Sequence, residues 1–140
     1  LGEVLDFIHE HNLRSRALLT DWCENMPDIL SAIDVLVSLS GGSVMYEAMA
    51  CERTVISAGF TKLEDAVHLQ DGKTGILIST KDIAPLVSAM ATVASDEALR
   101  RRLGTSAREQ IVQHLSVQAL ADKTHVVYAK VLDQSTSPEA

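Results

Sequence analysis

Short β-branched apolar runs alternate with helical segments over the first half of the chain, and this alternation constrains the fold more than any other feature. The runs lie at residues 35–37, 54–57 and 75–78. The first two do not alternate polar with apolar residues, which is typical of strands buried on both faces of a parallel sheet. We therefore predict βαβ units with helices on both faces of the sheet, and residues 35–37 and 55–56 as adjacent, fully buried strands.

The segments before these runs extend the α/β pattern toward the N-terminus. Apolar residues at helical spacing predict a helix over residues 1–11 with Asn12 as its C-terminal cap, and the apolar run 17–19 predicts a further strand. Pro27 suits the first turn of the next helix. The expected strands are fewer than a complete doubly wound sheet contains. We therefore expect a Rossmann-like sheet that lacks its N-terminal strands, in a chain that is a fragment of a larger protein.

The last part of the chain is expected to be entirely helical. Helical spacing begins at about residue 82 and continues to residue 134, with Gly104 expected to break one of the helices. Residues 135–140 are polar and are expected to form a frayed tail. The predicted organisation is thus one partial α/β domain over residues 1–134, followed by this tail.

Composition excludes several classes of function. The chain has 140 residues and a formal net charge of -7, which argues against a nucleic-acid groove because such a groove needs a basic stripe. The two cysteines form no CxxC pair, which favours a reduced compartment. No apolar run is long enough for a spanning helix, and no signal peptide is visible. We therefore expect a cytoplasmic protein.

The stretch between the run at 35–37 and the next helix carries the strongest functional signal. Gly41 and Gly42 stand between Ser40 and Ser43, directly ahead of a helical segment. Glycines let a phosphate approach the backbone, and the N–H groups and dipole of a helix start attract anions. Glu47 lies one turn into the helix, on the face of Ser43, where its carboxylate can accept hydrogen bonds from two ribose hydroxyls. This pairing favours a nucleotide site, while a plain glycine-rich βα turn is the alternative.

A series of segments resembles, in order, the C-terminal domain of two-domain (GT-B type) glycosyltransferases. The chain is similar to the group 1, family 4 branch, and the resemblance covers almost all of it. It implies the fold predicted above and a role as the half of the enzyme that binds a nucleotide-sugar donor. The segments that carry it lie at residues 26–37, 47–51, 54–57, 71–78 and 99–104.

The resemblance assigns roles to particular residues. The acid that matches Glu47 holds the ribose of the donor in that family. The region that matches Thr20, Asp21 and Trp22 contacts the base through main-chain groups. The donor nucleotide site is therefore expected to include Ser40, Gly41, Gly42, Ser43 and Glu47 with these three residues. The candidates for the border of the sugar pocket are Gly59, Phe60, Thr61 and Glu64.

Two departures from the family pattern limit what the resemblance implies. Retaining members carry an additional glutamate where this chain has Leu39, and the loop from Ser40 to Glu47 is similar to that of the peptidoglycan GlcNAc transferase. Retention and inversion of stereochemistry therefore both stay open. In the family, the diphosphate-binding arginine and lysine precede the segment that matches Leu1, and a separate domain binds the acceptor. We therefore expect the catalytic residues in a missing N-terminal part and no turnover by this chain alone.

The other polar residues give weaker signals. The five histidines show no metal-ligand spacing, so no metal is expected, and only His68, which follows the expected pocket helix, is kept as a further candidate. The arginine cluster at residues 100–102 is interpreted as a solvated helix face with i,i+4 ion pairs. Contact with an anionic membrane surface is the alternative.

The leading hypothesis is a glycosyltransferase that uses a nucleoside-diphosphate sugar, which the resemblance indicates to be UDP-linked, and no other cofactor. Its second substrate would be a saccharide or lipid-linked acceptor, bound by a domain outside this chain at the cytoplasmic membrane face. Two alternatives stay open: an isomerase similar to UDP-GlcNAc 2-epimerase, and a non-catalytic domain of the same fold.

Overall fold

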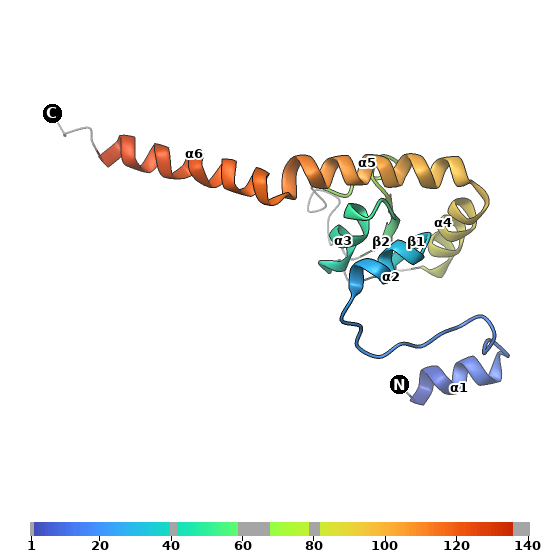
Figure 1. The fold of residues 1–140 in the computed structure, drawn as a ribbon. Coiled ribbons are helices and arrows are strands. Elements are labelled where there is room, and N and C mark those ends of the chain that lie inside the picture. Colours follow the sequence, from blue (N-terminus) through green and yellow to red (C-terminus); the bar gives the residue numbers. More distant parts are fainter. Residues whose placement is uncertain (1, 40–41, 59–67, 79–81, 136–140) are drawn as a thin grey trace.

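The computed structural model describes residues 2–39, 42–58, 68–78 and 82–135, and shows a small α/β body from which two helical segments extend (Figure 1). The long final helix leads away from the body on one side, and the first helix lies apart from it. In chain order the elements are α1 (Gly2–Glu10), α2 (Met26–Ala32), β1 (Val35–Ser38), α3 (Val44–Ala50), β2 (Thr54–Ser57), β3 (Ile76–Leu77), α4 (Ile83–Ser95), α5 (Glu97–Leu115) and α6 (Val117–Ser135).

The sheet is parallel and three-stranded, in the order β1-β2-β3. In its register Val37 pairs with Ile56, and Ile56 pairs in turn with Ile76. The predicted adjacency of the first two runs is confirmed, and all four residues of β2 are buried. Full burial of β1 is wrong, because Val37 is 36% exposed. β1 lies at an edge of this sheet, so within the described chain it pairs with β2 on one side and with no strand on the other.

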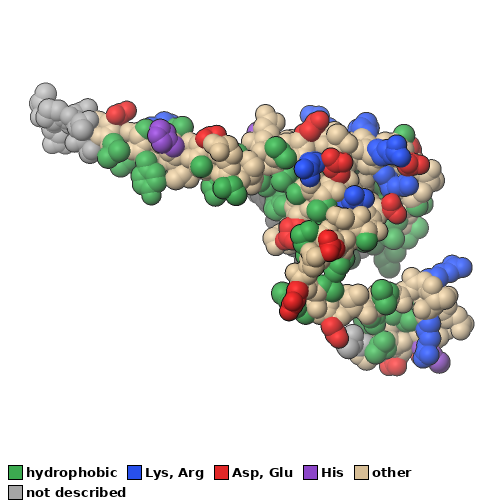
Figure 2. Space-filling model, viewed as in Figure 1, with side chains coloured by type: hydrophobic (Ala, Val, Ile, Leu, Met, Phe, Trp, Pro, Cys, Tyr) green, Lys and Arg blue, Asp and Glu red, His purple; other side chains and the backbone are tan. Residues whose placement is uncertain are grey.

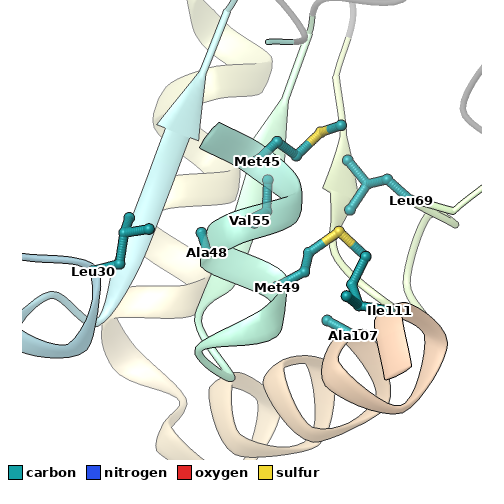
Figure 3. Packing of buried hydrophobic residues seen from close by; sticks show 8 residues of the cluster. All are labelled: Leu30, Met45, Ala48, Met49, Val55, Leu69, Ala107 and Ile111. Atoms are coloured by element: carbon teal, nitrogen blue, oxygen red, sulfur yellow. The ribbon is translucent and has the colours of Figure 1, made fainter. Parts of the chain in front are cut away.

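Helices cover both faces of the sheet, as predicted. Side chains alternate along β2, so that Val55 faces α3 and α5 while Ile56 packs against Ala89 and Val93 of α4. Figure 3 shows the larger cluster, in which the side chains of α3, β2 and α5 converge. Its buried members are Leu30, Met45, Ala48, Met49, Val55, Leu69, Ala107 and Ile111.

Gly104 does not break a helix, contrary to the expectation from the sequence, because α5 runs without interruption from Glu97 to Leu115. The glycine is buried, and a Cβ built on it would lie 2.2 Å from the carbonyl oxygen of Glu52. The missing side chain therefore lets α5 approach the turn between α3 and β2. Gly104 therefore allows close packing of α5 against the turn that contains Glu52.

The segment ahead of α2 also differs from the prediction. Residues 17–19 form no strand, and they lie in a coil that Figure 1 shows outside the body. Leu18 is 87% exposed. A strand needs a neighbour for its backbone N–H and C=O groups, and within the described chain this segment has none. The predicted end of the first helix is confirmed, since Asn12 has φ +53° and Leu13 N–H donates to the Ile8 carbonyl at 2.9 Å.

The final helix, α6, exposes an apolar stripe as it leaves the body (Figure 2). Side chains at helical spacing, which include Val117, Leu120, Val127, Tyr128 and Val131, are each more than half exposed. Within the described residues, no helix combines the length and the apolar character that crossing a bilayer requires.

The packing of α5 generates a stability prediction. Gly104→Ala should lower the free energy of unfolding by about 1–3 kcal/mol, because the added methyl group meets the backbone of Glu52. The clash costs more than the gain of about 1 kcal/mol that alanine brings to a helix interior, so the net effect is a loss of stability. Urea unfolding monitored by circular dichroism measures the difference. The matched control is Gly2→Ala, where a Cβ meets nothing within 4 Å. Equal or higher stability of the Gly104 variant would contradict this account of the α5 contact.

Candidate functional site

The connection from β1 to α3 is the predicted anion loop, and its described ends form the expected strand-turn-helix unit. β1 ends at the buried Ser38. On the helix side of the connection, the Gly42 carbonyl accepts from Met45 N–H at 3.2 Å. The Ser43 carbonyl accepts from Tyr46 N–H at 2.9 Å. Ser40 and Gly41 lie outside the described residues. The helix therefore begins a short connection after the carboxyl end of β1, at Val44.

The start of α3 presents several backbone hydrogen-bond donors. Among the described residues, no acceptor pairs with the N–H groups of Gly42, Ser43 and Val44. Ser43 has a helical backbone (φ -59°, ψ -28°), and its hydroxyl does not cap the helix. The capping role that the sequence allowed is therefore wrong, while its other role, a hydroxyl available to a ligand, stays a prediction. These N–H groups carry the positive end of the helix dipole.

One side of α3 is buried in the core and the opposite side is exposed to solvent. Met45, Ala48 and Met49 are fully buried against β2 and α5. Burial of each methionine stabilises the helix position by about 1.5–3 kcal/mol. Ser43 and Glu47 are exposed and one turn apart, so they share the outer face, as predicted. Within the described part of the chain the Glu47 carboxylate has no ion-pair partner. A rigid helix thus presents an acid to solvent.

The end of β2 lies beside the end of β1. Ala58 N–H donates to the Ser38 carbonyl at 3.2 Å, and Ile78 N–H donates to the Ser57 carbonyl at 2.9 Å. All three strands therefore end at one edge of the sheet, where ligands bind in open α/β folds. The four candidates for the sugar pocket follow β2 in sequence but lie outside the described residues: Gly59, Phe60, Thr61 and Glu64.

The three residues expected at the nucleotide base lie in the coil ahead of α2. Thr20 and Asp21 are exposed, and Trp22 is 92% exposed. The Asp21 carbonyl accepts from the Cys23 thiol at 3.2 Å. The structure does not bring these residues to the start of α3, so their contact with a base stays a prediction.

The arginines of the cluster on α5 bind other groups of the same chain. Arg101 pairs with Glu97 at 2.6 Å, the i,i+4 pair that the sequence predicted. Arg100 donates to the carbonyls of Val93 and Ala94 at the end of α4. Arg102 donates to the Gly72 carbonyl at 3.1 Å. Each guanidinium therefore has an intramolecular partner, which favours the structural interpretation over a membrane-binding patch.

A cluster that sequence spacing did not reveal joins α3 to α5. The His68 ring lies edge-on to Tyr46 with their centroids 6.0 Å apart, and it lies 6.0 Å from the ring of His114. Gln110 Nε2 is 3.4 Å from His68 Nδ1. Burial lowers the pKa of His68, and the positive charges of His114 and Lys123 lower it further. Only folding brings these distant positions together. Over the described part of the chain, His, Cys, Asp and Glu form no group of three or more that could hold a metal.

Comparison with known proteins gives a consistent picture. Residues 2–96 match the family model of the glycosyl transferases group 1. N-acetyl-alpha-D-glucosaminyl L-malate synthase of Bacillus anthracis is 25% identical in an alignment of 133 residues that covers 92% of this chain and 34% of that protein. Alpha-maltose-1-phosphate synthase of Mycolicibacterium smegmatis is 32% identical over 74% of this chain and 29% of its own length. The chain therefore spans about a third of the length of these curated relatives.

Solved structures share the fold. Sucrose-phosphate synthase from Thermosynechococcus elongatus superposes with a TM-score of 0.78 at 25% identity, over 95% of this chain and 34% of that one. Anabaena HepE, solved in complex with UDP-glucose, gives a TM-score of 0.79 at 18% identity, over 92% of this chain and 36% of that one. The C-terminal domain of a group 1 protein from Francisella tularensis gives 0.68 at 18% identity, over 83% and 62%. The α/β architecture predicted from the sequence is confirmed.

The anchoring of α3 generates the second prediction. Met49→Ala should lower the free energy of unfolding by about 2–5 kcal/mol, because the fully buried side chain leaves a cavity between α3 and α5. Met90→Ala on α4 makes the same chemical change at a side chain that is 47% exposed. It should cost less than about 1 kcal/mol. Urea unfolding of both variants provides the test, and similar losses at the two positions would refute the anchoring role of Met49.

Proposed function

This chain belongs to the glycosyl transferases group 1 family, and we propose that it supplies the donor-nucleotide site of an enzyme that transfers a sugar from a UDP-linked donor. One observation carries the proposal. The exposed Glu47 carboxylate stands about one turn from the N–H groups of Gly42, Ser43 and Val44, which have no acceptor among the described residues, at the carboxyl edge of a parallel sheet. A nucleotide offers the complement of this arrangement, an anionic diphosphate joined to a ribose diol.

The diphosphate is proposed to lie over the N–H groups of Gly41, Gly42 and Ser43, with the Ser40 hydroxyl beside it. Backbone donors and the helix dipole stabilise the negative charge that develops on the leaving diphosphate. Glu47 would accept hydrogen bonds from the ribose hydroxyls. Because both contacts come from one helix start, a single rigid element would position phosphate and ribose together.

The nature of the nucleotide is supported by the ligands of similar structures. Anabaena HepE is solved with UDP and with UDP-glucose, and Staphylococcus aureus TarM with UDP among its ligands. By the same proposal, main-chain groups of Thr20, Asp21 and Trp22 contact the uracil base. The pocket for the donor sugar is bordered by Gly59, Phe60, Thr61 and Glu64.

The remaining parts of the reaction are assigned to polypeptide beyond this chain. The relatives are about three times as long, so the acceptor site and the cationic groups that neutralise the diphosphate are proposed to lie in the additional length. The chain alone would then bind the donor without turning it over. The same proposal includes a saccharide or lipid-linked acceptor and a cytoplasmic enzyme at the inner membrane face.

The ribose contact is tested by removing its acid. Glu47→Ala should weaken UDP binding by about ten- to hundredfold, because a charge-assisted hydrogen bond contributes about 1.5–3 kcal/mol. Calorimetric titration of UDP into the full-length enzyme measures the change. Glu97→Ala removes the same charge at the start of α5, beside Thr54 at the opposite edge of the sheet, and should leave the affinity unchanged. Equal affinities of wild type and the Glu47 variant would refute the assignment.

The phosphate contact is tested separately. Gly42→Val places a branched side chain where the diphosphate must approach the backbone, so UDP binding should fall by at least about tenfold. Uridine, which has no phosphate, should bind wild type and this variant with equal, weak affinity, whereas Glu47→Ala should weaken both ligands. Competition against a fluorescent UDP analogue gives both affinities. An equal loss of uridine and UDP binding in the Gly42 variant would place the phosphate elsewhere.

A further inference from the structure

Side chains of α3 and α5 surround His68, and the donor site described above makes no use of this junction. The imidazole lies edge-on to Tyr46 of α3, with an interplanar angle of 81°, and is tilted by 31° to the His114 ring of α5. Gln110, one turn before His114 on α5, approaches Nδ1 of the same imidazole. The ring therefore lies between the helix that carries Glu47 and the long helix behind it.

The backbone of His68 is held in place by a buried hydroxyl. Thr74 is 5% exposed, and its Oγ1 donates to the His68 carbonyl at 3.0 Å. The same oxygen accepts from Gln70 N–H at 2.7 Å. Both bonds tie His68 to the turn that leads into β3. The backbone that carries the imidazole is therefore fixed relative to the turn before β3, and the ring contacts α3 from this position.

Tyr46 connects this junction to the donor site. It directly precedes Glu47 in α3 and follows the fully buried Met45, so it stands at the boundary between the packed and the exposed side of the helix. A contact at this boundary resists rotation of the helix about its axis, the motion that would displace the Glu47 carboxylate. The buried methionine side chains anchor the helix against β2 and α5, and the contact with His68 adds a restraint on its rotation.

We propose that His68 is a positioning residue for Glu47: as a neutral imidazole it holds, through Tyr46, the orientation of α3 in which the donor nucleotide binds. The inference rests on the proposed function. His68 touches neither nucleotide nor sugar in this proposal and acts only through the helix.

The groups around His68 explain why the neutral form is required. Nδ1 can accept a hydrogen bond from the Gln110 amide only while it is unprotonated. Among the described residues, the titratable and charged groups that face the ring are Tyr46 on α3, His114 on α5 and Lys123 on α6, whose Nζ donates to the His114 carbonyl at 3.0 Å. A proton on His68 would therefore break the Gln110 bond and add positive charge beside His114 and Lys123, which both disfavour it.

The direction of the pH dependence follows from the lowered pKa of His68. Since the folded junction disfavours the proton, its contribution to stability is complete above the ordinary value of 6.5 and is lost as the pH falls from 6.5 through the lowered pKa. Nucleotide affinity concerns the folded protein alone, so it should fall only as the pH approaches and passes below the lowered pKa of His68. A single proton changes the affinity by at most about tenfold per pH unit.

The test measures UDP affinity of the full-length enzyme by calorimetry between pH 7.5 and 5.5. His68→Asn keeps an acceptor oxygen near the position of Nδ1 and cannot ionise, so it should bind UDP like wild type at pH 7.5 and lose affinity less steeply on acidification. The terminal phosphate of UDP also takes up a proton near pH 6, but equally for every variant. His125→Asn, at an exposed position of α6, should retain the wild-type profile.

A second variant separates positioning from stability. His68→Leu should weaken UDP binding several-fold at every pH in this range, because it removes the acceptor for Gln110 and the polar ring edge against Tyr46. Identical pH profiles of wild type and His68→Asn would overturn the positioning role and leave the proposed function intact. A loss of stability in urea for His68→Leu with unchanged UDP affinity would overturn it as well. Absence of UDP binding by wild type at pH 7.5 would overturn both proposals.

Discussion

The complete burial of β2 is the constraint on which the rest of the structure depends. Its side chains alternate between two helical layers, so that Val55 faces α3 and α5 while Ile56 faces α4. No other described strand has helices and strands on every side. Because β1 and β3 pair with β2 in parallel register, all three strands end at one edge, and the connections that follow them meet there. The candidate site is thus a consequence of how one strand is buried.

The position of α3 connects the buried core to the polar groups of the candidate site. Fully buried side chains on one side of the helix lock it to β2 and α5, and Gly104 lets α5 approach the end of the same unit. The start of the helix and its outer face are left to solvent, with backbone N–H groups that have no acceptor among the described residues and with the Glu47 carboxylate. Stability and ligand recognition are therefore assigned to opposite sides of one short helix.

Most of the fold was predictable because its signals are local. The β-branched runs, the helical spacing and the left-handed Asn12 each depend on residues close in sequence. The errors have non-local causes. Residues 17–19 have the composition of a strand, but pairing requires a neighbour that the described chain does not provide. Residue 37 lies on an edge strand. Position 104 within α5 requires glycine because the Glu52 carbonyl occupies the space of a side chain.

The sequence by itself determined the βαβ pattern, the helix start after Gly42 and the shared face of Ser43 and Glu47, because strand and helix periods follow from backbone geometry alone. Membership of the group 1 family was likewise indicated by motifs in their order along the chain. Only the tertiary structure decided which strand is central, which helix face is buried, and that His68, Tyr46 and Gln110 meet. These are contacts between residues far apart in sequence, and no local pattern encodes them, because they arise only when separate elements pack together.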